Sequence, residues 1–138
     1  MADPIGIASG ILALAVFAFQ SSTRLYQLVQ SFQSHQRVVR ELGGELEELN
    51  GILRSLQETA ASMDVDLTTL KLPLLRCGKA CKDFEVIITK CTAHSSESRT
   101  SFRDWLKLRY MGDDIVGFKT MLAGYKSTIS IALGDVNM

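Results

Sequence analysis

Residues 4–19 read PIGIASGILALAVFAF, and no charged residue follows Asp3 until Arg24. Asp3 can cap a helix with its side chain, and Pro4 fits the first turn, where its missing N–H costs nothing. A helix of this composition is apolar on nearly every face. We therefore expect it to be deeply buried, either in protein or in lipid.

Four interpretations of this segment stay open. A secretory signal peptide needs a basic start that Met1 to Asp3 lack. A permanent transmembrane anchor needs about 20 apolar residues, and residues 4–19 rise only about 24 Å as a helix. The segment is otherwise a permanent core helix, or a helix that packs in the soluble state and enters lipid after activation. Gly6 and Gly10 allow close helix approach in either solvent, so the sequence does not choose between these two.

The composition of the whole chain predicts an all-α fold. The chain has 138 residues, 46% of them hydrophobic and 22% charged, which suits one globular domain with a real core. Only two prolines interrupt it, so long stretches are free to form helices. We predict a single domain over residues 1–138, a bundle of five to six helices. The expected helices are 1–19, 20–34, 35–63, 72–92, 101–110 and 113–134.

The clearest amphipathic pattern is a leucine seam in the expected helix 35–63. Its apolar residues alternate by threes and fours, which is the spacing of a face that packs on neighbouring helices. Gly43 and Gly44 lie inside the seam and predict a kink or a close approach by another helix. The seam residues are Val38 or Val39, then Leu42, Leu46, Leu49, Leu53 and Leu56.

Two later helices repeat this pattern. The expected helix 72–92 has an apolar stripe of Leu74, Cys77, Cys81, Phe84, Ile88 and Cys91. The expected helix 113–134 has a stripe of Ile115, Phe118, Leu122, Tyr125, Ile129 and Ala132 or Leu133. Both spacings predict one buried face.

The formal net charge is zero, but the charges are divided between two segments. Residues 41–66 contain seven acids and one base, and residues 71–109 contain nine bases and four acids. One interpretation is that two neighbouring helices attract each other across the bundle. The other is that the basic helix presents a face to anionic lipid headgroups. The residues for such contact are Lys71, Arg76, Lys79, Lys82 and Lys90.

No catalytic constellation is apparent in the sequence, and we expect no enzyme activity and no cofactor. His35 and His94 lie beside polar stretches and in no known catalytic motif. Cys77, Cys81, Cys91 and His94 are zinc-type ligands, but Cys91 would lie about 15 Å beyond Cys81 on one helix. We therefore expect buried thiols and no metal site. The odd number of cysteines favours a reducing, cytoplasmic setting, and the modest basic segment predicts no nucleic-acid binding.

Several motifs, taken in order, resemble the fungal HeLo-like domain, the N-terminal domain of many fungal STAND (NOD-like) receptors. They begin with MADPIGIAS at residues 1–9 and RELGGELEEL at residues 40–49. They continue with LPLLRCGKACKDF at residues 72–84, DWLKL at residues 104–108, DIVGFK at residues 114–119 and YKSTI at residues 125–129. The resemblance covers nearly the whole chain.

The resemblance implies a helical bundle that serves as a cell-death effector in a fungal immune or incompatibility system. Such domains look related to the HeLo toxin domain and to the four-helix killing domain of necroptosis executioners. A sensor or nucleotide-binding module, in cis or as a partner receptor in trans, would drive self-association and relocation from the cytoplasm to the plasma membrane. A non-lytic oligomerisation or adaptor domain is the alternative. The membrane-inserting residues that the resemblance implies are Ile5, Ile7, Ile11, Leu12, Leu14, Val16, Phe17 and Phe19.

Overall fold

The structure, a computed structural model, describes residues 4–31, 37–62, 67–92 and 109–136. Within these ranges the side chains of residues 4–9, 38, 62, 90–92, 109–114 and 135–136 are not described. The described part is entirely helical, which confirms the predicted fold class. Its elements are α1 (Pro4–Ser31), α2 (Arg37–Ser62), the 3₁₀ turn η1 (Thr68–Leu70), α3 (Lys71–Thr92) and α5 (Arg109–Val136).

Four α-helices in the described ranges are fewer than the five to six expected. The expected helices 1–19 and 20–34 are one continuous helix, because α1 runs from Pro4 to Ser31. The polar residues between Gln20 and Thr23 therefore lie within a helix and do not end one. The expected short helix 101–110 lies outside the described residues, apart from its last two positions, which belong to α5.

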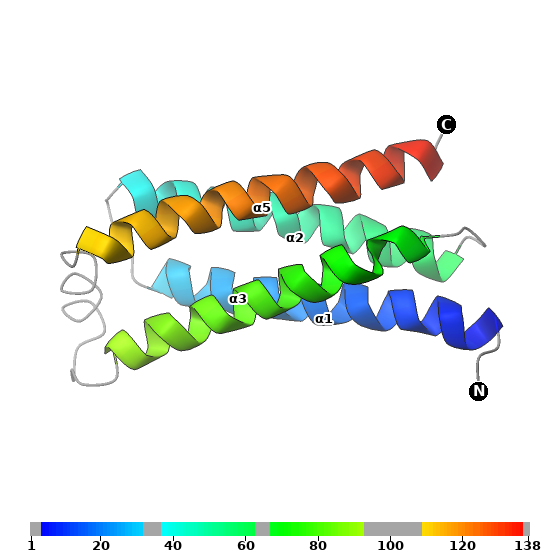
Figure 1. Cartoon of the computed structure of the whole chain (residues 1–138), viewed down its shortest axis with the longest axis horizontal. Helices are drawn as coiled ribbons and strands as arrows, with labels where there is room; N and C mark the ends of the chain where they lie inside the picture. The colour runs from blue at the N-terminus through cyan, green and yellow to red at the C-terminus, as the bar shows by residue number, and fades with distance from the viewer. Residues whose placement is uncertain (1–3, 32–36, 63–66, 93–108, 137–138) are drawn as a thin grey trace.

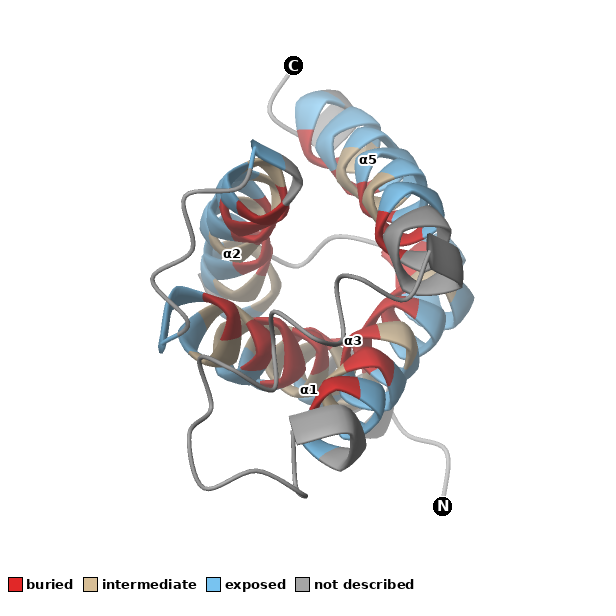
Figure 2. Ribbon diagram, turned by 90° about the vertical axis from the view of Figure 1, so that its left-hand side faces the viewer, coloured by how far each residue is buried: buried red, intermediate tan, exposed pale blue. Residues whose placement is uncertain are grey.

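The four helices form an elongated bundle (Figure 1). In that view α1 and α3 run in one direction along the bundle, and α2 and α5 run in the other. Helix α1 packs along both α2 and α3, whereas α5 packs along α2 and touches α3 over a shorter stretch. Helices α2 and α3 therefore lie on one diagonal of the bundle, and α1 and α5 on the other (Figure 2).

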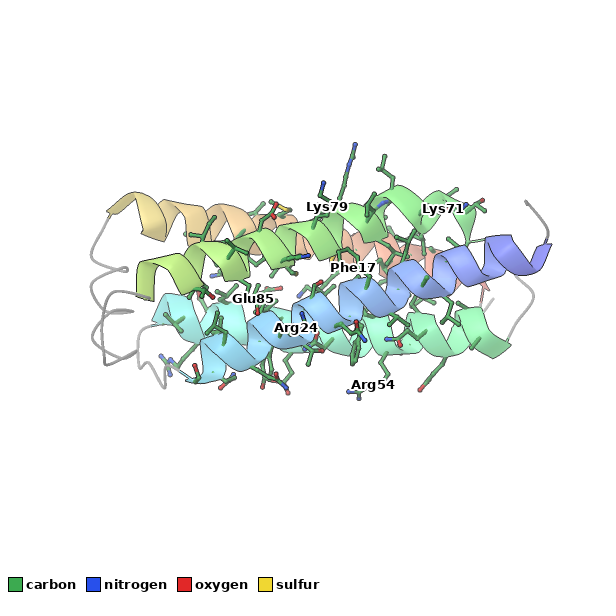
Figure 3. All side chains as sticks on the ribbon, turned by 90° about the horizontal axis from the view of Figure 1, so that it is seen from below. Phe17, Arg24, Arg54, Lys71, Lys79 and Glu85 are labelled. Atoms are coloured by element: carbon green, nitrogen blue, oxygen red, sulfur yellow. The ribbon has the colours of Figure 1, made fainter. Side chains whose placement is uncertain are left out.

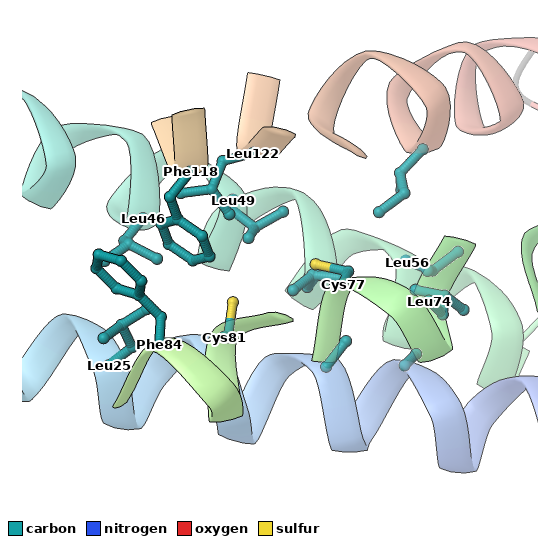
Figure 4. Close-up of a cluster of buried hydrophobic side chains, with 14 of the residues drawn as sticks. Leu25, Leu46, Leu49, Leu56, Leu74, Cys77, Cys81, Phe84, Phe118 and Leu122 are labelled. Carbon is teal, nitrogen blue, oxygen red and sulfur yellow. The ribbon is translucent and has the colours of Figure 1, made fainter. Parts of the chain in front are cut away.

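The core follows the predicted seams. All the leucines of the α2 seam are fully buried, and so is Val39. The described residues of the α3 stripe are buried as well, and in α5 Ile115, Phe118, Leu122, Ile129 and Leu133 are buried. Residues from all four helices meet in one cluster (Figure 4). Burying each of these large side chains stabilises the fold by about 1.5–3 kcal/mol relative to leaving it exposed.

In addition to its buried apolar face, helix α5 contacts the other helices through an aromatic stack and a set of ion pairs. The rings of Phe118 and Phe84 stack with their centroids 4.3 Å apart and an interplanar angle of 4°. Lys119 Nζ lies 2.7 Å from Glu41 Oε1. Lys126 pairs with Glu45 and, at 2.5 Å, with Glu48 Oε2. The acids of α2 thus hold α5 in place.

Candidate functional site

The N-terminal helix joins the bundle through a narrow seam in which half of the residues are small. All its buried residues except Ser21 recur at alternating spacings of four and three, so they fall on one face of the helix. Small side chains in this seam let the backbone of α1 come close to α2 and α3. The seam residues are Ile11, Ala15, Ala18, Ser22, Leu25 and Val29.

The bundle by itself provides the expected deep burial for only one face of the described part of α1. Ala13 is exposed, although it lies in the middle of the apolar segment. Of the residues implied to insert in the membrane, Ile11 is buried, and the side chains of Ile5 and Ile7 lie outside the described residues. The other five are only half-buried, since the seam occupies a single face. They are Leu12, Leu14, Val16, Phe17 and Phe19.

Two of the half-buried aromatic side chains make specific contacts. The ring of Phe17 lies directly over Gly78 of α3, where a Cβ atom would be only 2.4 Å from Phe17 Cε2. Figure 3 shows Phe17 between α1 and α3. The guanidinium carbon of Arg54 lies 5.8 Å from the centroid of the Phe19 ring, within the range of a cation–π contact. Phe17 therefore faces α3, and Phe19 faces α2.

The predicted close approach at the two glycines of α2 is confirmed at one of them. A Cβ atom on Gly43 would lie 3.1 Å from Gln30 Nε2 of α1, whereas a Cβ on Gly44 would meet nothing within 4 Å. Gly43 is therefore the point where α2 accommodates the C-terminal half of α1.

The middle of α1 carries buried hydroxyl groups. Ser22 Oγ and Thr23 Oγ1 are buried without a hydrogen-bond partner in the described part of the protein. An unpaired buried polar group costs about 1–3 kcal/mol. These residues lie where the uncharged half of α1 meets its polar half. Within the described residues, no helix is both long enough and apolar enough to span a membrane.

The basic residues of α3 lie on its outer surface. Lys71, Arg76, Lys79 and Lys82 are exposed, and the side chain of Lys90 lies outside the described residues. None of the ion pairs seen among the described residues involves these four cations. Lys79 extends from the side of α3 that faces away from α1 (Figure 3).

The expected attraction between the acidic segment and the basic segment is therefore not what the described helices show. The paired acids of α2 bind Lys119 and Lys126 of α5, both of which lie beyond the basic segment 71–109. The reason is the diagonal placement of α2 and α3, which keeps the charged outer faces of these two helices apart. A charge count along the sequence cannot show which helices are neighbours.

The ion pairs between α2 and α5 shift the pKa values of the groups that form them. The hydrogen bond from Lys119 holds the pKa of the Glu41 carboxyl below its ordinary value. Burial alone would lower the pKa of Lys126, but its hydrogen bonds and charge interactions with Glu45 and Glu48 outweigh this, and the pKa is raised. Both groups are therefore charged across the neutral range.

The two described cysteines lie in the core as free thiols. The hydrogen bond with Cys77, together with burial, raises the pKa of Cys81, so this thiol is not a nucleophile at neutral pH. No group of three metal-ligating side chains occurs within the ranges that the structure describes. The side chains of Cys91 and His94 lie outside those ranges.

An open groove of about 550 Å³ lies between α2 and α5. It is lined by Glu48, Gly51, Ile52, Ser55, Lys126, Ser127 and Ser130. The ammonium group of Lys126 is taken up by its two glutamates, so the groove does not offer this cation to a ligand.

One set of surface residues was missed in the sequence. Leu72, Leu75, Val86 and Ile87 of α3 are exposed large apolar side chains, and they lie among the cations described above. The sequence feature that indicates this surface is the helical spacing of residues 72, 75, 79, 82 and 86, which places apolar and basic residues on one face.

These features define a helical-bundle domain with a partly buried first helix, whose N-terminal half is uncharged, and a third helix whose outer face is both basic and apolar. The chain belongs to the PigL_N family, described as the N-terminal domain of pigment biosynthesis cluster protein PigL, whose model matches residues 2–138. PigL_N is a HeLo-like fungal domain family, so the resemblance is confirmed at that level. No curated protein and no solved structure matches the chain.

Proposed function

We propose that this domain is a cell-death effector, which oligomerises and permeabilises a membrane through the N-terminal half of α1. The observation that carries the proposal is that this half is uncharged, while five of its large side chains are only half-buried in the bundle, namely Leu12, Leu14, Val16, Phe17 and Phe19. Helix α1 thus has more apolar surface than the bundle uses. A lipid environment would cover the remainder.

The mechanism is an exchange of one apolar environment for another. Fully exposing residues 4–19 to water would cost about 1.5–3 kcal/mol for each large side chain. The helix must therefore stay in the bundle or enter a bilayer. Because residues 4–19 rise about 24 Å against a hydrocarbon core of about 30 Å, we expect several copies to insert together and thin the bilayer locally.

Membrane insertion is then regulated by the partner that brings copies of the domain together. We propose a sensor or nucleotide-binding module, in cis or on a partner receptor in trans, that raises the local concentration of the domain. The domain would reside in the cytoplasm at rest and relocate to the plasma membrane after activation.

The test uses half-buried positions, where a substitution changes the surface available to lipid more than it disturbs the packing of the core. Leu12 and Val16 lie four residues apart and are half-buried, so aspartates there are tolerated by the bundle far better than an aspartate at buried Ala15. We expect Leu12→Asp/Val16→Asp to keep its helical circular dichroism and to lose dye release from liposomes and killing of cells. Gln27→Asp, on an exposed position of the polar half, is the matched control and should leak like wild type. Undiminished leakage from the double variant would refute the proposal.

A second candidate is a non-lytic oligomerisation or adaptor domain. The description of its family favours this candidate, since it names a pigment biosynthesis cluster protein and not a toxin. The adaptor predicts soluble oligomers in multi-angle light scattering and no binding of the wild-type domain to liposomes. Lipid binding with leakage would exclude it.

A further inference from the structure

The outer face of α3 carries a continuous line of apolar and basic residues. Leu72, Leu75, Lys79, Lys82 and Val86 follow one another at alternating spacings of three and four, so they lie along one side of the helix. The line is about 21 Å long. The exposed fractions of Leu72, Leu75 and Val86 are 51%, 40% and 42%, so the bundle leaves about half of each residue uncovered.

Further exposed residues flank this line. Lys71, Arg76 and Ile87 lie beside it, and Ile87 is 38% exposed. The acids on the described part of α3 are exposed Asp83 and half-buried Glu85, against four exposed cations. The face is therefore cationic and apolar at once, and no ion pair seen between described residues involves its cations.

We propose that this face is the docking surface by which the intact bundle lies flat on an anionic phospholipid membrane, before α1 is released. Lysines along such a face place their ammonium groups among lipid phosphates while their alkyl stems stay in apolar surroundings. The leucines and valine enter the interfacial region beside them, as in amphipathic helices that lie in the membrane plane. Charge complementarity selects the membrane as the partner, because α3 offers both parts of a lipid interface.

The position of α3 explains why docking there would serve the proposed function, on which this inference rests. Helices α1 and α3 run in the same direction, and the Phe17–Gly78 contact fixes their register. The part of the uncharged segment around Phe17 therefore lies beside the first half of α3. Because the lysine face of α3 faces away from α1, a bundle docked through it holds α1 parallel to the bilayer and close to it, and α1 still has to leave the bundle to enter lipid.

The experiment measures binding of the full chain to vesicles of phosphatidylcholine, with and without phosphatidylserine, by co-sedimentation. We expect binding to the anionic vesicles. Lys79→Gln/Lys82→Gln should weaken it about 25-fold, from about fivefold per cation. Leu72→Ser/Leu75→Ser should weaken it by a similar factor, because each loses its interfacial burial. All four residues are exposed, so both variants should fold.

Two matched controls separate this face from general effects. Arg40→Gln removes a cation from an exposed position on α2, and Ile131→Ser removes an apolar side chain that is 64% exposed on α5. Neither should change vesicle binding by more than about twofold. Equal losses in the controls, no binding by wild type, or a change in soluble oligomeric state in place of vesicle binding would each overturn the docking surface.

Failure of the docking surface can be distinguished from failure of the proposed function. Vesicle binding that requires the α3 face, without dye release, would keep the docking surface and refute permeabilisation. Dye release that persists in the α3 variants at wild-type level would keep permeabilisation and refute docking through α3.

Discussion

The contact between Phe17 and Gly78 predicts how tightly α1 is held, and Gly78→Ala tests it. Gly78 is buried in the middle of α3. An added methyl group would sit 2.4 Å from Phe17 Cε2 and 2.6 Å from Cδ2, both far inside van der Waals contact. Either the ring turns out of its site or α1 moves away from α3.

Two opposing terms set the magnitude. Replacing glycine by alanine inside a helix stabilises by about 1 kcal/mol. Overpacking a filled site destabilises by about 1–3 kcal/mol. The net change for Gly78→Ala is therefore a loss of up to about 2 kcal/mol. In a Phe17→Ala background the clash is absent, so Gly78→Ala should instead stabilise by about 1 kcal/mol.

Urea unfolding of the four proteins in this double-mutant cycle measures the coupling, which we expect to be about 1–3 kcal/mol. Gly51→Ala is the control, because a Cβ there meets nothing within 4 Å and gives only the helix-propensity gain. If the proposed function holds, Gly78→Ala should also release dye from vesicles faster than wild type. The reasoning is refuted if Gly78→Ala stabilises the wild-type background as much as it does the Phe17→Ala background.

Three further predictions follow from the polar groups of the bundle. Lys126→Met should destabilise by about 1–3 kcal/mol in urea unfolding, since it leaves the Glu45 carboxylate unpaired, and adding Glu45→Gln should recover part of the loss. The hydrogen bond from Lys119 lowers the pKa of Glu41 in the folded protein. The charged carboxylate therefore stabilises the fold above the ordinary carboxyl pKa, and this stabilisation is lost as the pH falls through the lowered pKa of the folded state. The melting temperature should decline below about pH 4.5, and it should decline less in Glu41→Gln. Ser22→Ala should stabilise by about 1 kcal/mol or more in thermal melts and slow dye release, because it removes an unpaired buried hydroxyl; a loss of stability would show that the hydroxyl is satisfied.

Much of the fold was predictable because apolar periodicity reports directly on burial. Each leucine of the α2 seam is buried where the spacing put it. The boundary expected near Gln20 was wrong, because Ser21 and Ser22 read as a polar break. In the bundle both are buried, and Ser22 continues the seam from Ala18 to Leu25. A small hydroxyl side chain can fill a close helix contact, and sequence periodicity does not distinguish that case from a helix end.

The candidate sites were less predictable because they depend on which helices are neighbours. The sequence placed acids and bases in separate segments, but only the structure shows that α2 pairs with Lys119 and Lys126 of α5. The lysines of α3 were identified from the sequence as basic. Leu72 and Val86 were not recognised beside them, because an apolar residue in an amphipathic helix is normally assigned to the core.

The ion pairs seen among the described residues are distributed unevenly over the four helices, since all of them lie on α2 and α5. Helix α5 is bound to α2 by ion pairs at Lys119 and Lys126, and a lipid phase would not replace those pairs. No ion pair seen among the described residues involves α1, which is held mainly by apolar contacts. Lipid can replace apolar contacts at little cost. If the proposed function holds, transfer of α1 to a membrane exchanges its apolar contacts with α2 and α3 for lipid and breaks no ion pair seen among the described residues.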